Sequence, residues 1–168
     1  MLKIFNDLKP FFEDCYREIS VREYSRETGI SPPTASKLLK DFEKEGLLIM
    51  RGERGFLLFR ANRESEELKD FSRIYWRNKL KKLFEFLSDE FHSPTIILFG
   101  SLAKLEVIEK SDIDLVLLTE FKKNVDLSKF KKQFGREIQI FKFKSIKEIN
   151  KELQLNVLEG YLIQGVLK

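Results

Sequence analysis

The fold of this chain is decided by Thr95-Ile96-Ile97-Leu98-Phe99-Gly100-Ser101, followed after ten residues by Asp112-Ile113-Asp114-Leu115-Val116-Leu117-Leu118. The first run is apolar and β-branched, which is typical of a buried strand, and Gly100-Ser101 ends it where a helix can begin. Asp112 and Asp114 are two positions apart, so on a second strand both carboxylates point to the same face. Two oxygen ligands near a helix N-terminus favour a site for Mg²⁺ and a phosphate chain.

These residues resemble the signature of the DNA polymerase beta-like nucleotidyltransferase superfamily, especially its minimal members. Ala103 and Ser111 also match the small members, whereas Lys104 replaces an arginine and Leu105 replaces a glycine. The resemblance implies that Asp112 and Asp114 hold two Mg²⁺ ions in an active enzyme. It also implies that the phosphates of a nucleoside triphosphate (NTP) are bound by Gly100, Ser101 and Lys104. Either half of the pattern alone also occurs in solvated turns and strand edges.

The superfamily resemblance further implies a third carboxylate, on the strand predicted over 136–143. The matching position is Gln139, and Glu137 would lie on the same face of that strand. A neutral amide is a weaker metal ligand and proton acceptor than a carboxylate, so loss of catalysis is an alternative to activity. Glu137 is therefore a catalytic candidate only if the register or a bulge brings it to the two aspartates.

The first 60 residues carry the pattern of helices followed by a β-hairpin. The apolar spacing over 5–19 predicts a helix that begins after Pro10, with a short helix before it. A second helix over 21–28 ends at Gly29, and a third begins with Ser31 as N-cap and runs to about Glu45. Apolar runs at 47–50 and 56–59 flank a glycine-rich turn and predict the hairpin. Residues 11–60 thus resemble winged helix-turn-helix domains of transcription regulators.

By that resemblance the third helix enters the major groove of double-stranded DNA, and the hairpin tip reaches phosphates or the minor groove. Acidic residues at 41, 43 and 45 oppose phosphate binding on part of that helix. Because winged helices also serve as dimerisation or protein-interaction modules, a protein partner is the alternative to DNA. The candidate DNA contacts are Ser31, Pro33, Thr34, Ser36, Lys37, Lys40, Arg51 and Arg54.

The apolar spacing from Arg63 to about Phe91 predicts one long helix. This helix would link two domains and pair with its copy in a homodimer, or it would serve as the first packing helix of the second domain. We therefore expect an α+β protein with a winged domain (1–62), a linking helix (63–92) and a nucleotidyltransferase-like domain with a small mixed sheet (93–168). Residues 120–134 predict a helix or loop, and 146–168 predict one or two closing helices.

Composition restricts the remaining function classes. Charged residues make up 35% of the 168 positions, but the net charge is only +4 and no segment is polybasic. DNA binding must therefore come from a local face. The single Cys15 cannot form an internal disulfide, and we find neither a targeting segment nor a long apolar run. We expect a cytoplasmic protein with no membrane partner.

Three functions follow from these patterns. The first is an Mg²⁺-dependent nucleotidyltransferase that carries a DNA-binding domain and transfers a nucleotidyl group from an NTP to an unidentified acceptor. The second is a transcription regulator whose nucleotidyltransferase fold senses a nucleotide. The third is a nucleotidyltransferase of the antitoxin type, whose acceptor is a partner protein.

Overall fold

The computed structural model describes residues 2–53 and 55–167, and the chain forms two compact units. One unit comprises Met1–Phe71 together with Leu105–Glu109. The other comprises Ser72–Lys104 and Lys110–Lys168. The segment 105–109, which connects the Gly-Ser turn to the two aspartates along the chain, thus belongs to the N-terminal unit.

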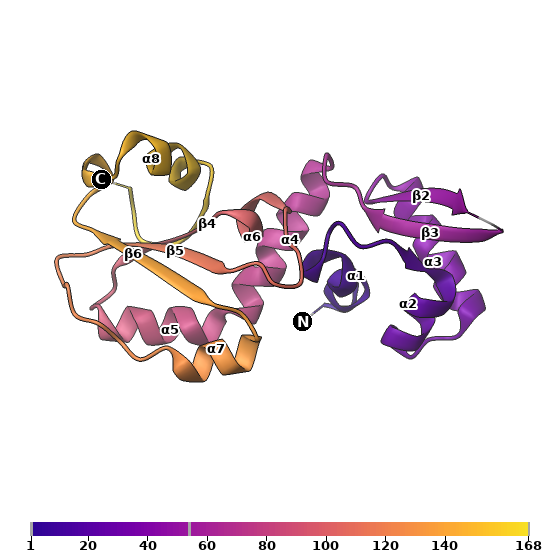
Figure 1. Ribbon diagram of the computed structural model, residues 1–168, viewed down its shortest axis with the longest axis horizontal. Helices are drawn as coiled ribbons and strands as arrows, with labels where there is room; N and C mark the ends of the chain where they lie inside the picture. Colours follow the sequence, from indigo (N-terminus) through magenta and orange to yellow (C-terminus); the bar gives the residue numbers. More distant parts are fainter. Residues whose placement is uncertain (1, 54, 168) are drawn as a thin grey trace. The chain divides into compact units, whose positions relative to one another are not determined.

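The N-terminal unit has the helix-turn-helix and the hairpin that the sequence predicts (Figure 1), whereas the helix expected over the apolar spacing to residue 19 ends at Glu13. Its three strands form an antiparallel sheet in the order β1-β3-β2, in which β2 and β3 are the two arms of the hairpin. The elements are α1 (Lys3–Glu13), β1 (Ile19–Ser20), α2 (Val21–Thr28), α3 (Pro32–Lys44), β2 (Leu48–Glu53) and β3 (Phe56–Ala61).

Local sequence signals explain where α2 and α3 begin and end. Ser20 caps α2, and Gly29 ends it in the left-handed region with φ of 73°. Ser31 accepts a hydrogen bond from the Thr34 amide, and Pro32 occupies the first turn of α3. The predicted boundaries of both helices are therefore confirmed.

The predicted interruption at Pro10 is wrong, because α1 is a single helix that contains this proline. Proline in a helix interior costs about 3 kcal/mol. Burial of one large apolar side chain contributes roughly 1.5–3 kcal/mol, and four such side chains of α1 are buried, so packing outweighs the local penalty. The four are Phe5, Leu8, Phe11 and Phe12.

Cys15 joins the end of α1 to the segment 105–109. Its amide donates to the Val107 carbonyl at 2.9 Å, and its thiol lies 3.0 Å from the Leu105 carbonyl oxygen. The side chain is fully buried, and burial raises the pKa of the Cys15 thiol to about 11.

We expect Cys15 to resist iodoacetamide in the folded protein at pH 8, because a buried thiol with a raised pKa supplies almost no thiolate. Alkylation should become fast when urea unfolds the chain, which mass spectrometry would record. The raised folded-state pKa favours the folded protein below about pH 9, and this contribution is lost as the pH rises towards 11. Rapid alkylation of the folded protein would contradict the burial of this side chain.

The C-terminal unit is built on a four-stranded mixed sheet in the order β6-β5-β4-β7. β5 and β6 are parallel, and the other neighbours are antiparallel, so the predicted small mixed sheet and the α+β class are confirmed. Helices α5 and α7 lie on one side of the sheet and α8 lies on the other (Figure 1). Its elements are the second half of α4 (Glu66–Lys79), α5 (Lys81–Glu90), β4 (Thr95–Phe99), α6 (Ser101–Lys104), β5 (Ile113–Leu118), α7 (Ser128–Phe134), β6 (Ile138–Phe143), the 3-10 turn η1 (Ile146–Glu148), α8 (Lys151–Leu158) and β7 (Tyr161–Gln164).

The single long helix predicted from Arg63 to Phe91 is instead two helices, α4 and α5, which meet at Leu80. Leu80 has φ of −92° and ψ of 5°, outside the helical region. Because Leu80 is itself apolar and fully buried, the apolar periodicity continues through the break. Neither proline nor glycine occurs at the break, so the sequence contains no local signal for it, and the change of direction depends on how both helices pack.

The predicted closing helices account for α8 but not for β7. Residues 161–164 instead pair antiparallel with β4, with Tyr161 opposite Leu98. Gly160 precedes the strand, and a Cβ placed there would lie 2.8 Å from the Leu98 carbonyl oxygen. The apolar pattern of residues 161–164 is compatible with either a helix or a strand. These residues form a strand because they can pair with the edge of β4.

No helix in the described part of the chain combines the length and the apolar composition that crossing a membrane requires.

Candidate functional site

The turn between β4 and α6 brings Gly100 against Asp114. In the antiparallel register Phe99 lies opposite Asp114, so the residue after Phe99 faces the carboxylate. Gly100 has φ of 70°, and a Cβ at this position would lie 2.5 Å from Asp114 Oδ2. Only glycine both adopts this backbone conformation without strain and leaves room for the carboxylate.

The two predicted aspartates lie at the start of β5. Asp112 directly precedes the strand, and Asp114 is its second residue and is half-buried. Burial raises the pKa of the Asp114 carboxyl, and the charge of Asp112 raises it further. The ionised Asp114 is thus poorly solvated and is repelled by Asp112, and a cation would relieve both effects.

Gln139 stands where the resemblance implies a third carboxylate. It lies opposite Asp114 in the parallel register of β5 and β6. Its side-chain Nε2 donates a hydrogen bond of 2.6 Å to Asp112 Oδ2. The amide therefore belongs to the same cluster as both aspartates, but it contributes no negative charge.

Glu137, the other candidate for the third carboxylate, is not brought to the pair. Its side chain forms an ion pair with Lys131 of α7 and is 66% exposed. Its backbone carbonyl instead accepts a hydrogen bond of 2.8 Å from the Ile113 amide. Within residues 2–53 and 55–167, no three His, Cys, Asp or Glu side chains are grouped so that they could hold a metal ion.

Arg136 is a site residue that sequence reasoning missed. Its Nη1 donates 2.7 Å to the Ser111 carbonyl, directly before Asp112, and its guanidinium lies 5.3 Å from the centre of the Trp76 ring. The residue is only 8% exposed. Arg136 and the Glu137 carbonyl thus hold the backbone on both sides of Asp112. In the sequence Arg136 follows a glycine at the start of a strand and resembles a solvated turn residue.

Lys104, the expected phosphate ligand, is bound to α8 in this structure. Its Nζ lies 3.0 Å from Asn156 Oδ1 and 2.6 Å from Glu159 Oε2. Phosphate binding by Lys104 therefore stays a prediction, and it requires this lysine to exchange those partners. Leu105, which replaces the glycine of the small family members, has φ of 57° and is fully buried. A left-handed leucine costs roughly 1–2 kcal/mol, which burial of its side chain offsets.

The predicted DNA-contacting residues at the start of and along α3 lie on its exposed face, with the exception of Ser36. Ala35, Leu39 and Phe42 are buried on the opposite face, and Ser36 is half-buried between the two faces. Lys37 and Lys40 form no ion pair within the part of the chain that the structure describes. The exposed candidates on this face are Ser31, Pro33, Thr34, Lys37 and Lys40.

Arg51 on β2 differs from the two lysines because two carboxylates neutralise it. Its Nε lies 2.6 Å from Glu18 Oε1, and its Nη2 lies 2.7 Å from Glu53 Oε2. These bonds raise the pKa of the guanidinium further above its usual range. A contact from Arg51 to DNA would compete with both acids. Arg54, the other hairpin candidate, lies outside the described residues.

Comparison with protein families gives two matches. Residues 80–160 match the family model of the nucleotidyltransferase domain, and residues 16–49 match that of the winged helix-turn-helix DNA-binding domain. The chain joins a winged helix-turn-helix domain to a nucleotidyltransferase domain. Both resemblances are thereby confirmed. No curated protein and no solved structure matches the chain.

Asp112 and Asp114 of the nucleotidyltransferase domain are oxygen donors of the kind that would hold a divalent cation. Asp112 and Asp114 supply two carboxylates whose repulsion a cation would relieve, which is the donor chemistry that Mg²⁺ prefers. Gln139 would present its amide oxygen to the same place if its side chain flipped. Compared with three carboxylates, this set carries one negative charge fewer.

Proposed function

We propose that this protein binds DNA through its winged helix-turn-helix domain and binds an Mg²⁺–NTP complex in its nucleotidyltransferase domain, with binding rather than transfer as the role of the nucleotide. The observation that carries this proposal is Gln139, which lies opposite Asp114 and donates to Asp112. Within the described residues, no third acidic side chain joins Asp112 and Asp114. If both aspartates hold the cation, a carboxylate that could accept a proton from an attacking hydroxyl is missing. Bound nucleotide would then act as a signal in a regulator of transcription.

Gly100, Ser101, Asp112 and Asp114 would form the nucleotide site. When bound, Mg²⁺ would neutralise the charge of the triphosphate at the two carboxylates. The Gly100 turn provides the space for Asp114, and Arg136 holds the backbone at Asp112. Ser101 at the start of α6 would offer its amide and hydroxyl to the phosphates.

Transfer by the wild-type protein is the second candidate function. It is favoured by the Gly-Ser turn and the aspartate pair, which the tertiary structure keeps together. The two candidates differ in one measurable property, because a transferase releases pyrophosphate when it is given an acceptor, whereas a sensor retains the NTP intact.

Replacing Gln139 with glutamate should increase pyrophosphate release, with water taking the nucleotidyl group when no other acceptor is supplied. The change adds a carboxylate beside Asp112 and supplies a proton acceptor, whose contribution in enzymes is roughly 100- to 10,000-fold. We expect a gain of about 10-fold or more for Gln139→Glu, because this acceptor is placed without further optimisation. Calorimetry with each NTP and Mg²⁺, together with a pyrophosphate assay, measures binding and release in parallel.

The matched control is Gln133→Glu, which makes the same chemical change on the exposed surface of α7. It should leave both binding and release unchanged. Fast pyrophosphate release by the wild-type protein would favour the transferase function over the sensor function. If the wild-type protein does not bind NTP, both candidate functions, sensor and transferase, would be contradicted.

Lys37→Ala and Lys40→Ala should each weaken binding to duplex DNA. Both side chains are exposed on α3, and each phosphate contact removed should reduce the slope of log affinity against log salt by about 1. Arg51→Ala should have a smaller effect, because Glu18 and Glu53 already neutralise this arginine. Fluorescence anisotropy at several salt concentrations measures these slopes.

Lys9→Ala is the matched control, since Lys9 is an exposed lysine of α1 in the same unit. Equal losses for Lys9 and Lys37 would mean that bulk charge, rather than the face of α3, binds DNA. An affinity that is insensitive to salt would remove the phosphate-binding role altogether.

A further inference from the structure

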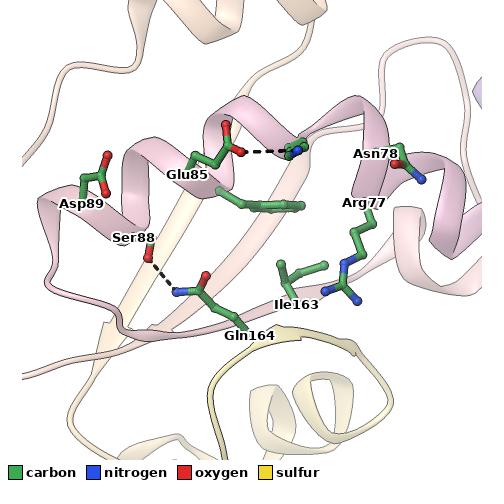
Figure 2. Close-up of a pocket in the computed structure, with 9 residues that line it drawn as sticks. Arg77, Asn78, Glu85, Ser88, Asp89, Ile163 and Gln164 are labelled. Atoms are coloured by element: carbon green, nitrogen blue, oxygen red, sulfur yellow. Dashed lines mark hydrogen bonds and ion pairs between the residues drawn. The ribbon is translucent and has the colours of Figure 1, made fainter. Parts of the chain in front are cut away.

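A groove of about 760 Å³ lies between the helices α4 and α5 and strand β7 of the nucleotidyltransferase domain. Phe84 and Ile163 contribute apolar surface to it, and Figure 2 shows charged side chains of α4 and α5 around the same space. β7 is the last strand of the sheet, so no described strand pairs with its outer side. Leu162 on this strand is 38% exposed. A strand edge with which no described strand pairs, beside a groove, is a site where another strand can add.

The charges along this groove change sign from one end to the other. Lys81, Glu85 and Asp89 follow one another at intervals of four residues along α5, so the lining from this helix is positive at its start and negative towards its end. Arg77, near the end of α4, adds a second positive charge. Lys81 and Glu85 lie 3.6 Å apart, and their side chains are 72% and 59% exposed, so both are available to a partner. A two-fold axis across the groove would place the positive end of one copy against the negative end of the other.

We propose that this groove is the interface of a homodimer in which β7 pairs antiparallel with β7 of a second copy. A two-fold axis perpendicular to the sheet relates two edge strands in an antiparallel manner, as the pairing requires. The two sheets would become one continuous sheet, and the exposed Leu162 side chains would lie on the same face of it. We infer that a second copy of the chain is the partner, because a two-fold axis would place the positive start of α5 in one copy beside the negative end of α5 in the other.

The homodimer would form through α4, α5 and β7 and would not depend on nucleotide binding. Analytical ultracentrifugation of the full chain at micromolar concentrations should show a dimer. Lys81→Glu and Glu85→Lys should each weaken dimerisation by about tenfold, because like charges then meet across the axis. The double variant Lys81→Glu/Glu85→Lys should regain most of the wild-type affinity, since the exchanged charges are again complementary.

Leu162→Asp tests the strand pairing independently of the charges. It places two carboxylates near the axis and should yield a monomer, and circular dichroism would verify that the fold is retained. Lys144→Glu is the control, because Lys144 is an exposed lysine paired with Glu120 and lies outside the groove. A wild-type protein that stays monomeric would overturn the proposal. So would a dimer that tolerates all of these substitutions, or one that the double variant fails to restore.

Discussion

Replacing Asp114 with asparagine should weaken Mg²⁺-dependent nucleotide binding by on the order of 100-fold or more, while the protein without ligand becomes slightly more stable. Among the described residues, Asp114 supplies one of two carboxylates in the cluster, so its loss removes half of the charge that would attract the cation. The free protein gains because burial and Asp112 both disfavour the ionised form of Asp114. Calorimetry with Mg²⁺–NTP and a thermal melt without ligand measure the two effects.

Asp114→Asn should stabilise the free protein because the pKa of Asp114 is raised in the folded state. The pKa of Asp114 is raised in the folded state, so protonation favours folding at low pH, and this advantage is lost as the pH rises through the folded-state pKa. At neutral pH the ionised carboxylate therefore opposes folding. An asparagine removes that opposition, and the difference in Tm between the variant and the wild type should shrink as the pH is lowered.

Glu137→Gln is the matched control for Asp114→Asn. It makes an equivalent change from acid to amide, but at an exposed side chain that pairs with Lys131. We expect nearly wild-type nucleotide binding from this variant. A loss as large as that of Asp114→Asn would identify Glu137 as the third carboxylate and would show that the loop before β6 moves when ligand binds.

Gly100→Ala should have the second largest effect on nucleotide binding. The new Cβ would lie 2.5 Å from Asp114 Oδ2, so the Asp114 carboxylate must move away from its present position. Because the clash involves the end of a side chain, the chain can relax and the fold should survive. A cation site depends on the position of that oxygen, however, and we expect binding to fall about 10- to 100-fold.

Gly135→Ala is the control that distinguishes the clash with Asp114 from the backbone strain of an alanine with positive φ. Gly135 has φ of 64°, close to the 70° of Gly100, and lies in the same unit, but an added Cβ would meet no atom within 4 Å. Both variants should lose about 1–2 kcal/mol of stability from the left-handed conformation. Only Gly100→Ala should also lose nucleotide binding, and equal binding by the two variants would contradict the crowding at Asp114.

The closeness of Gly100 to Asp114, on which the proposed nucleotide site depends, could be predicted because the two residues are close in the sequence. Gly100 and Asp114 are joined by one short helix and a loop, and two adjacent antiparallel strands bring them together. The helix-turn-helix could also be predicted from the sequence, because Gly29 ends α2 and Ser31 begins α3 through contacts within their own helical turns. Such signals depend on backbone hydrogen bonds and φ angles within a few residues, so they survive in a sequence considered alone.

The sequence by itself determined the two domains, the mixed sheet and the pairing of the Gly-Ser turn with the two aspartates, because each depends on local conformation or on strand periodicity. Tertiary structure alone decided that Gln139 rather than Glu137 lies beside Asp112, and that Arg136 supports it. It also decided that α1 continues through Pro10 and that β7 is a strand. These outcomes depend on contacts between distant segments, whose burial and pairing energies exceed the local preferences that a sequence pattern records.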